Sequence, residues 1–244
     1  MGRIPCKLNR LTTYCGCYGT NYPKWNQQVF NQKNVMLGAS ALDEQRKTDL
    51  VMNGYILDDT LDNISNLNYT FGDLTNSYWV WKNAKEEWVG LTQYRRFWLE
   101  HQVAKIDWNP NTIYIAQPQI WQSVMSQFTE NHGVFAIQKL FESAMRPESK
   151  LKHDHVNMLN NIYTMYPYNM LFAHKDLYDK VCEVQFEILF DVYERSKEHI
   201  EGLDDYQRRM IAFLSERLLP ILYINKKYFF GDAVNTEVVE MIWV

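Results

Sequence analysis

Short apolar runs bounded by Gly or Pro characterise the first half of the chain. The stretch RLTTYCGCYG predicts a strand that ends at Gly16 and Gly19, and TIYIAQP predicts another that Pro118 stops. Between them, Val89 and Leu91 mark a short apolar strand that leads directly into the sequence TQYRRFW. The pattern therefore predicts several short buried strands before residue 120.

Helical spacing dominates the second half. From Lys180 onward, apolar residues recur every three or four positions, at Val181, Val184, Ile188 and Val192. A second helix is expected to begin after Asp204 or Asp205 and to end near Pro220. Its expected inward-facing residues are Tyr206, Met210, Phe213, Leu214 and Leu218.

Two further segments connect strands with helices. Asp73 is predicted to cap a helix through LTNSYWVWKN, and PYNMLFAHKDLY predicts a buried strand that turns into a helix. This alternation favours an α/β sandwich with a largely parallel sheet, whose ligand site lies at the carboxyl ends of its strands. Because the 244 residues contain no repeats or Gly/Ser linkers, we predict one domain over residues 1–244.

Composition narrows the class of protein. A net charge of −4 argues against a general nucleic-acid binder, while the 15% aromatic content suits both a core and stacking on flat ligands. No apolar run is long enough to span a bilayer, and the basic N-terminus is not followed by the apolar core of a signal peptide. We expect a cytoplasmic protein, at most peripheral at the inner face of the membrane.

The cysteines do not suggest a metal site. Cys6, Cys15, Cys17 and Cys182 show no zinc-like spacing, and reduced thiols are the expected state.

An arginine pair follows the strand in WVGLTQ. Buried guanidinium groups need an anionic partner, so Tyr94, Arg95 and Arg96 point either to a ligand phosphate or to an internal carboxylate. Neighbouring residues on a strand face opposite sides, so only one arginine is expected to reach a given pocket unless the chain has turned.

The stretch DDTLDNIS places four polar side chains on one predicted turn. Asp58, Asp59, Asp62 and Asn63 can orient a ribose, a base edge or a metal-bridged diphosphate, or can simply form a solvated acidic turn. The sequence lacks the aspartate-any-aspartate pair that usually holds a metal for nucleotide sugars.

Two other clusters contain candidate acids and bases. In KHDHVN, His153 and His155 flank Asp154. These side chains are either metal ligands or an acid/base centre, or Asp154 is simply the N-cap of a helix. In FLSERLL, Glu216 lies in an apolar helical stretch, where it is either an internal ion-pair partner or a catalytic base.

The motifs DDTLDNIS, DLTNSYWVWKN, VGLTQYRRF, NMLFAHKDLYDKVC and FLSERLL occur in this order. Their series resembles a family of bacterial cell-surface polysaccharide glycosyltransferases, catalogued as a domain of unknown function, over about residues 34–224. Members occur in capsule, exopolysaccharide and O-antigen gene clusters, and some resemble galactofuranosyltransferases with a UDP-linked donor. The family pattern has Glu at the position of Asp73 and His at the position of Gln93.

The resemblance implies a GT-A-like fold. A nucleotide-sugar-binding half would cover about residues 8–120, and a mostly helical acceptor half about residues 121–244. It implies that Arg95 or Arg96 neutralises the UDP diphosphate without a required metal. Asp58, Asp59, Asp62, Asn63, Gln93 and Tyr94 would complete the donor site. The alternative is Mn²⁺ or Mg²⁺ held by the three aspartates.

The expected reaction is transfer of galactofuranose or another hexose from a UDP-sugar to a glycan or lipid-linked glycan. An inverting mechanism needs a carboxylate base, for which Glu216 is the first candidate and Asp154 the second. The rival interpretation is a non-catalytic module that binds a glycan or nucleotide sugar, with Gln93 in place of a catalytic group.

Overall fold

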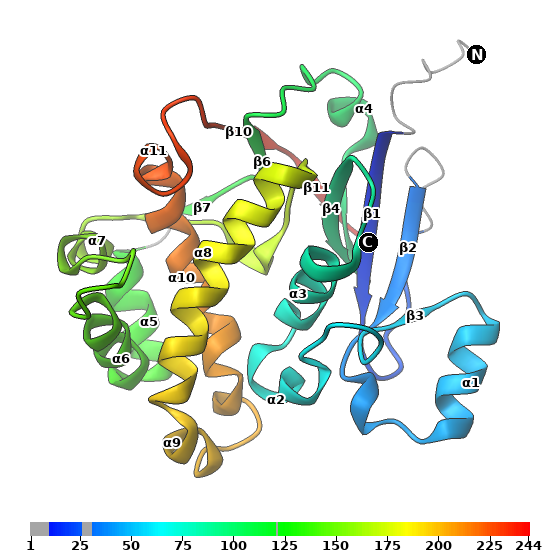
Figure 1. The fold of residues 1–244 in the computed structure, drawn as a ribbon, viewed down its shortest axis with the longest axis horizontal. Coiled ribbons are helices and arrows are strands. Elements are labelled where there is room, and N and C mark those ends of the chain that lie inside the picture. The colour runs from blue at the N-terminus through cyan, green and yellow to red at the C-terminus, as the bar shows by residue number, and fades with distance from the viewer. Residues whose placement is uncertain (1–9, 26–30, 121) are drawn as a thin grey trace.

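A nine-stranded sheet organises the molecule, and helices gather beside it toward the C-terminal part (Figure 1). The computed structural model describes residues 10–25, 31–120 and 122–244. The strands are β1 (Leu11–Cys17), β2 (Asn31–Met36), β3 (Ile56–Leu57), β4 (Trp88–Gln93), β5 (Arg96–Trp98), β6 (Thr112–Ala116), β7 (Gln119–Ile120), β8 (Thr164–Met165), β9 (Leu171–His174), β10 (Asn235–Val239) and β11 (Met241–Trp243).

The sheet is mixed, whereas the sequence predicts a largely parallel one. Its main path is β10-β6-β9-β4-β1-β2-β3, in which β1 pairs in parallel with both β2 and β4. Strand β9 runs antiparallel to β4 and β6, and β11 adds antiparallel to β5. Parallel pairing therefore holds from β4 through β1 and β2 to β3, where the carboxyl ends of β1, β2 and β4 meet at one edge. It also holds for β6 and β10 at the other end of the sheet.

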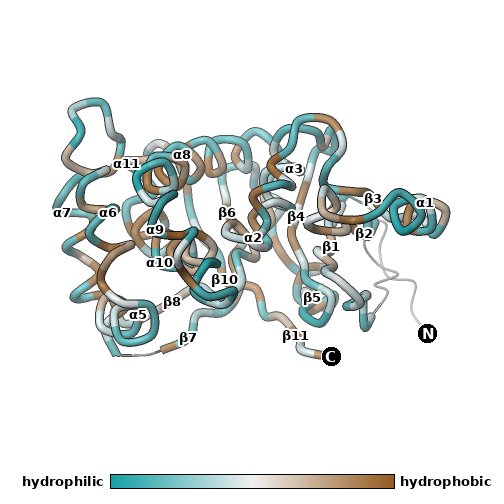
Figure 2. The backbone as a smooth tube through the Cα atoms, turned by 90° about the horizontal axis from the view of Figure 1, so that it is seen from below, coloured by the Kyte–Doolittle hydropathy of each residue, from teal (hydrophilic) through white to brown (hydrophobic). Residues whose placement is uncertain are grey.

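The helices are α1 (Glu44–Met52), α2 (Asn68–Phe71), α3 (Leu74–Asn83), α4 (Glu100–Val103), α5 (Val124–His132), α6 (Phe135–Ala144), α7 (His153–Asn157), α8 (Lys175–Glu194), α9 (Lys197–Glu201), α10 (Met210–Ile224) and α11 (Lys226–Phe230). Figure 2 shows α5–α11 on one side of the molecule and α1 with β2 and β3 on the other. The 3₁₀ turns η5 (Pro167–Asn169) and η6 (Gln207–Arg209) precede β9 and α10, respectively.

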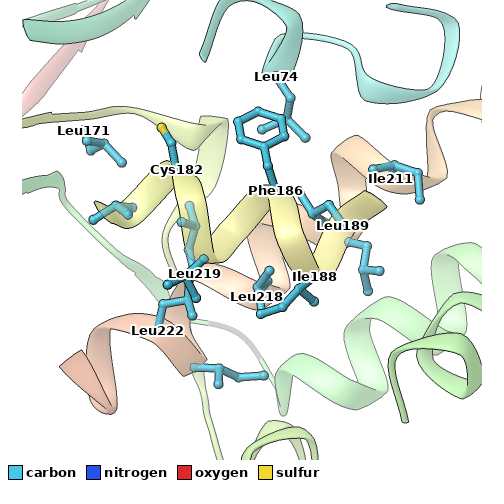
Figure 3. Packing of buried hydrophobic residues seen from close by; sticks show 14 of the residues in the cluster. Leu74, Leu171, Cys182, Phe186, Ile188, Leu189, Ile211, Leu218, Leu219 and Leu222 are labelled. Atoms are coloured by element: carbon cyan, nitrogen blue, oxygen red, sulfur yellow. The ribbon is translucent and has the colours of Figure 1, made fainter. Parts of the chain in front are cut away.

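The long helix α8 connects the sheet with the other helices. It packs against β4, β6 and β9 and against α3, α6 and α10. Its apolar positions are buried as their spacing predicts. In the core, Ile188 lies beside Leu218 of α10, and Phe186 points to the other side of α8, toward Leu74 (Figure 3). In the described part of the chain, no helix is long and apolar enough to cross a bilayer.

Helix α10 continues past the predicted stop at Pro220 and ends at Ile224. Proline lacks the N–H that would bond one turn back. The following residues, Ile221, Leu222 and Tyr223, are buried in the same core, and this burial keeps the segment helical.

Gly90 on β4 allows close approach of β9. It lies opposite Phe172, and a Cβ at position 90 would lie 2.6 Å from the Phe172 Cβ. We expect Gly90→Ala to lower the free energy of unfolding by about 1–3 kcal/mol, as for other overpacked cores. Urea unfolding measures the change. The matched control is Gly202→Ala, where the nearest atom would be 3.6 Å away and the effect should stay within about 0.5 kcal/mol. Equal effects of the two variants would contradict the packing described here.

Candidate functional site

A cavity of about 660 Å³ opens at the carboxyl ends of β1 and β4. Residues from the sheet and from the helical part both line it, including Gly16, Tyr18, Leu37, Asp73, Gln93, Tyr94, Arg95, Arg96, Tyr168, Asn169, Arg208, Arg209, Phe213 and Glu216. The strand that leads to the arginines therefore ends at this cavity, in agreement with a ligand site at the carboxyl ends of the strands. Both arginines line it because β4 ends at Gln93 and the chain turns at Tyr94 before β5 begins.

Arg96 is a buried cation between two aromatic rings. Only 8% of the surface of Arg96 is exposed. The guanidinium carbon of Arg96 lies 3.8 Å from the centre of the Tyr168 ring and 4.1 Å from the centre of the Trp243 ring. Its Nη1 donates a hydrogen bond to Gln93 Oε1. Within the described part of the chain, neither Arg95 nor Arg96 forms an ion pair with a carboxylate, so the internal ion pair considered for them is not found.

The two rings come from distant parts of the chain. Trp243 lies opposite Arg96 in the antiparallel pair of β11 and β5. Tyr168 and Asn169 both have positive φ angles, of 74° and 50°, which is uncommon for residues with a side chain and is often found at functional sites. Neither Tyr168 nor Trp243 belongs to a motif that marks a site in the sequence, so sequence reasoning missed both.

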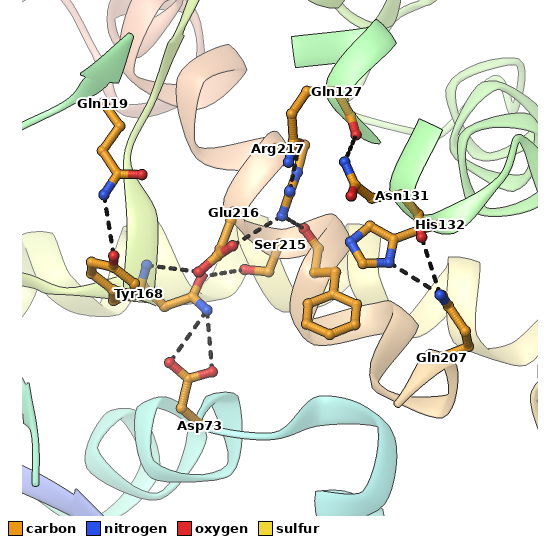
Figure 4. A network of polar contacts seen from close by, with 12 residues as sticks. Asp73, Gln119, Gln127, Asn131, His132, Tyr168, Gln207, Ser215, Glu216 and Arg217 are labelled. Carbon is orange, nitrogen blue, oxygen red and sulfur yellow. Dashed lines mark hydrogen bonds and ion pairs between the residues drawn. The ribbon is translucent and has the colours of Figure 1, made fainter. Parts of the chain in front are cut away.

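Asp73 faces the cavity instead of capping α3. It precedes the helix as predicted, but its carboxylate accepts no hydrogen bond from the helix backbone. It accepts one from Gln93 Nε2 at 2.8 Å. It accepts another from Asn169 Nδ2 at 3.3 Å, and Figure 4 shows this contact as dashed lines that end at Asp73. Burial, followed by the negative charge of Glu216, raises the pKa of Asp73 to about 6. The acidic residue of the family pattern at this position was the signal that could have identified it.

Glu216 forms the internal ion pair considered for it and also lines the cavity. Its Oε1 accepts the backbone N–H of Tyr168 at 2.7 Å, and its Oε2 pairs with Arg217 Nη1 at 2.9 Å. The Arg217 side chain is almost fully buried and also donates to Gln127 Oε1 at 2.6 Å. The internal ion pair is therefore present, and the carboxylate still lines the cavity.

The acidic turn lies outside the cavity lining, and the prediction that one of its aspartates lines the main cavity is wrong. Asp58 is fully buried and accepts the backbone N–H groups of Gly38 and Ala39, each at 2.9 Å. Asp59 pairs with Lys47 at 2.8 Å. Asp58 thus stabilises the loop after β2, because unpaired backbone N–H groups are costly to bury. Asp59 instead ties its turn to α1 through Lys47.

Asp62 and Asn63 are also engaged within the protein. Asp62 Oδ1 accepts the hydroxyl of Tyr78 at 3.1 Å. Asn63 donates to the carbonyl oxygen of Leu61 at 2.9 Å and accepts the N–H of Ser65 at 3.1 Å. These bonds define the turn, and neither side chain reaches the cavity.

Asp154 lies on α7, away from the cavity, with a fully exposed side chain. The helix begins at His153 with Lys152 as its N-cap, so Asp154 is in the first turn and the capping prediction is wrong by two positions. Among the described residues, no three or more His, Cys, Asp or Glu side chains are grouped to hold a metal ion. Cys15, Cys17 and Cys182 are buried free thiols, and Cys6 lies outside the described residues.

Comparisons with known proteins support the fold. A family model described as "Domain of unknown function (DUF4422)" matches residues 26–227. A solved structure described as the apo structure of the bifunctional glycosyltransferase WbbM is similar, with a TM-score of 0.71 and 20% sequence identity. The likeness covers 97% of this chain and 45% of that one, so this chain spans about half the length of its structural relative. No curated protein matches the sequence. The predicted GT-A-like α/β fold with a helical C-terminal part is thereby confirmed.

The raised pKa of Asp73 has a measurable consequence for stability. The folded protein holds the Asp73 proton more tightly than the unfolded chain, so ionisation of this group opposes folding. The contribution of Asp73 to the free energy of unfolding is greatest below pH 4, which is about the ordinary pKa of an aspartate. This contribution falls as the pH rises to about 6 and stays constant above pH 6. Asp73→Asn removes this dependence.

We therefore expect the stability of the Asp73→Asn variant, relative to the wild type, to improve between pH 4 and 6 and to level off above pH 6. Urea unfolding at a series of pH values measures the difference. A difference that stays constant over this range would contradict the raised pKa.

Proposed function

The chain belongs to the family described as a domain of unknown function (DUF4422), and on that premise we propose that it is a glycosyltransferase. Its donor is a UDP-sugar, and its acceptor is a hydroxyl of a glycan or lipid-linked glycan. The transferred sugar is galactofuranose or another hexose, and the product belongs to a surface polysaccharide. The glycosyltransferase fold over nearly the whole chain supports the reaction class.

The observation that carries the proposal is the position of Arg96. A buried guanidinium that pairs with no carboxylate of residues 10–25, 31–120 and 122–244, held between Tyr168 and Trp243 at the cavity wall, is a cationic site prepared for an anion. Arg95 lines the same cavity, with its guanidinium carbon 5.4 Å from the Trp243 ring. Arginine is permanently charged and matches phosphate oxygens with paired donors, so this pair suits a diphosphate.

The arginine pair also fits the chemistry of the leaving group. In the proposed displacement, the acceptor oxygen forms a bond to the anomeric carbon while the bond from that carbon to the phosphate oxygen breaks. UDP leaves with the bonding electrons, and the growing negative charge on its phosphate is stabilised by Arg95 and Arg96. Such fixed counter-charge is often the largest single contribution to catalysis.

Glu216 is the proposed base. Its carboxylate lines the cavity and would take the proton of the attacking hydroxyl as the new bond forms. The N–H of Tyr168 and the guanidinium of Arg217 orient the group. Asp73 is a second carboxylate in the same cavity, with a pKa of about 6, and Gln93 links it to Arg96 through one amide. Because an amide does not titrate, Gln93 holds this link at every pH.

Donor binding is expected to depend on arginine and not on metal. Arg96→Ala should weaken UDP binding about ten- to a hundredfold, because loss of a charged hydrogen-bond partner costs on the order of 1.5–3 kcal/mol. Wild-type binding should survive EDTA. Isothermal titration of UDP and UDP-sugars, with and without EDTA, measures both effects.

The matched control is Arg46→Ala on α1, which removes the same charge from a residue outside the cavity lining and should leave UDP affinity unchanged. Loss of binding on chelation, restored by Mn²⁺, would favour the metal alternative in which carboxylates hold the diphosphate.

The base is tested by Glu216→Gln, which keeps the size of the side chain but cannot accept a proton. We expect turnover of UDP-sugar to fall by about 10²–10⁴, with UDP affinity little changed. Asp154→Asn should retain turnover, since the exposed Asp154 side chain lies outside the cavity.

Release of UDP from each donor in the presence of acceptor measures turnover. Retained turnover in Glu216→Gln together with lost turnover in Asp154→Asn would identify Asp154 as the base. Tight UDP-sugar binding by the wild type without turnover on any acceptor would favour the non-catalytic module.

A further inference from the structure

Helix α10 presents a row of three chemically different residues to the cavity. Arg209 immediately precedes the helix, and Phe213 and Glu216 follow on it at spacings of four and three residues. Residues at these spacings share one helix face. At 1.5 Å per residue, the seven positions from Arg209 to Glu216 extend over about 10 Å of the cavity wall.

Phe213 offers a flat apolar surface in the middle of this row. It is half-buried, lines the cavity, and packs against His132 with ring centres 4.3 Å apart. The ring is thus held in place by its neighbours while part of it stays accessible. Aromatic rings in this setting commonly stack on the apolar face of a sugar.

Arg209 supplies positive charge at the outer end of the row. Its side chain is exposed, its guanidinium carbon lies 5.5 Å from the Phe213 ring, and no carboxylate pairs with it in the described part of the chain. It lies beside Gly72, where an added Cβ would be 3.7 Å from Arg209 Nη2. The positive charge of Arg209 also acts to lower the pKa of Asp73, so this charge influences a carboxylate inside the cavity.

Arg208 adds a second cation at the same end. It pairs loosely with Asp205, at 3.5 Å, and donates to the carbonyl oxygen of Glu201 at 3.1 Å. Its Nε is buried and has no hydrogen-bond partner among the described residues. A buried donor without a partner is costly, and a bound anion at this end would reduce that cost.

The position of the row separates it from the donor arginines. Arg95 and Arg96 follow the end of β4, whereas Arg209 immediately precedes the helix that carries the proposed base. In an in-line displacement, the attacking hydroxyl and the leaving diphosphate lie on opposite sides of the anomeric carbon. An anion bound on the side of the base therefore belongs to the acceptor.

Resting on the proposed function, we propose that α10 forms the acceptor subsite and that the acceptor carries an anionic group. Arg209, helped by Arg208, binds a phosphate or carboxylate of the acceptor, Phe213 stacks on its sugar, and Glu216 receives the hydroxyl proton. The anion lies about 10 Å from the reacting hydroxyl, roughly one or two hexose rings away.

Binding of defined disaccharides tests this assignment. With the wild-type protein saturated with UDP, isothermal titration compares a disaccharide 1-phosphate, a disaccharide with a terminal uronate and the neutral disaccharide. We expect at least one anionic ligand to bind about tenfold or more tightly than the neutral one. Whether the phosphate or the uronate binds more tightly identifies the source of the anion.

Arg209→Ala should abolish most of this preference, Arg209→Lys should retain part of it, and both should bind UDP within about twofold of the wild type. The control is Arg195→Ala, which removes an exposed arginine that pairs with Asp191 outside the cavity lining.

Equal binding of neutral and anionic disaccharides by a protein that binds UDP would overturn the acceptor assignment and leave the proposed function intact. A loss of UDP affinity in Arg209→Ala as large as that in Arg96→Ala would also overturn the acceptor assignment, since Arg209 would then belong to the donor site. Absence of UDP binding in the wild type would instead contradict the proposed function itself.

Discussion

A buried positive charge at the end of the central strand constrains the rest of the site. Removing the guanidinium of Arg96 from water is unfavourable, and no carboxylate within the described residues pairs with it directly. The faces of Tyr168 and Trp243 and the amide oxygen of Gln93 compensate in part. The backbone of Tyr168 adopts a left-handed conformation, and β11 adds to the edge of β5, so that both rings reach this position.

Hydrogen bonds that start at Arg96 join the sheet to the helical part. Gln93 links Arg96 to Asp73, Asn169 continues from Asp73, and Ser215 of α10 donates to Asn169 Oδ1 at 2.7 Å. A change at one member therefore shifts the charge balance and geometry of the others. The raised pKa of Asp73 is one consequence, since its carboxylate is buried near Glu216. Cooperative networks of this kind hold a site rigidly when each member is satisfied.

The two sides of the cavity suit different tasks. In the proposed function, the permanently charged arginines after β4 hold the leaving diphosphate without a change of protonation. The helical side carries a carboxylate and an aromatic ring on α10, and two further arginines in the turn η6 that precedes this helix. Both sides place these groups on or directly beside helices and strands, which position side chains more precisely than loops do.

Local patterns in the sequence determined the strands β1, β4, β6 and β9, the helices α8 and α10, and the arginine pair at the end of β4. These features depend on side-chain periodicity and on turn residues, which act over a few neighbouring positions. Only the tertiary structure decided that Asp58 binds backbone groups after β2, and that Tyr168 and Trp243 enclose Arg96. Those contacts join residues far apart in the chain, and their geometry follows from strand order and register, which periodicity within a single segment does not specify.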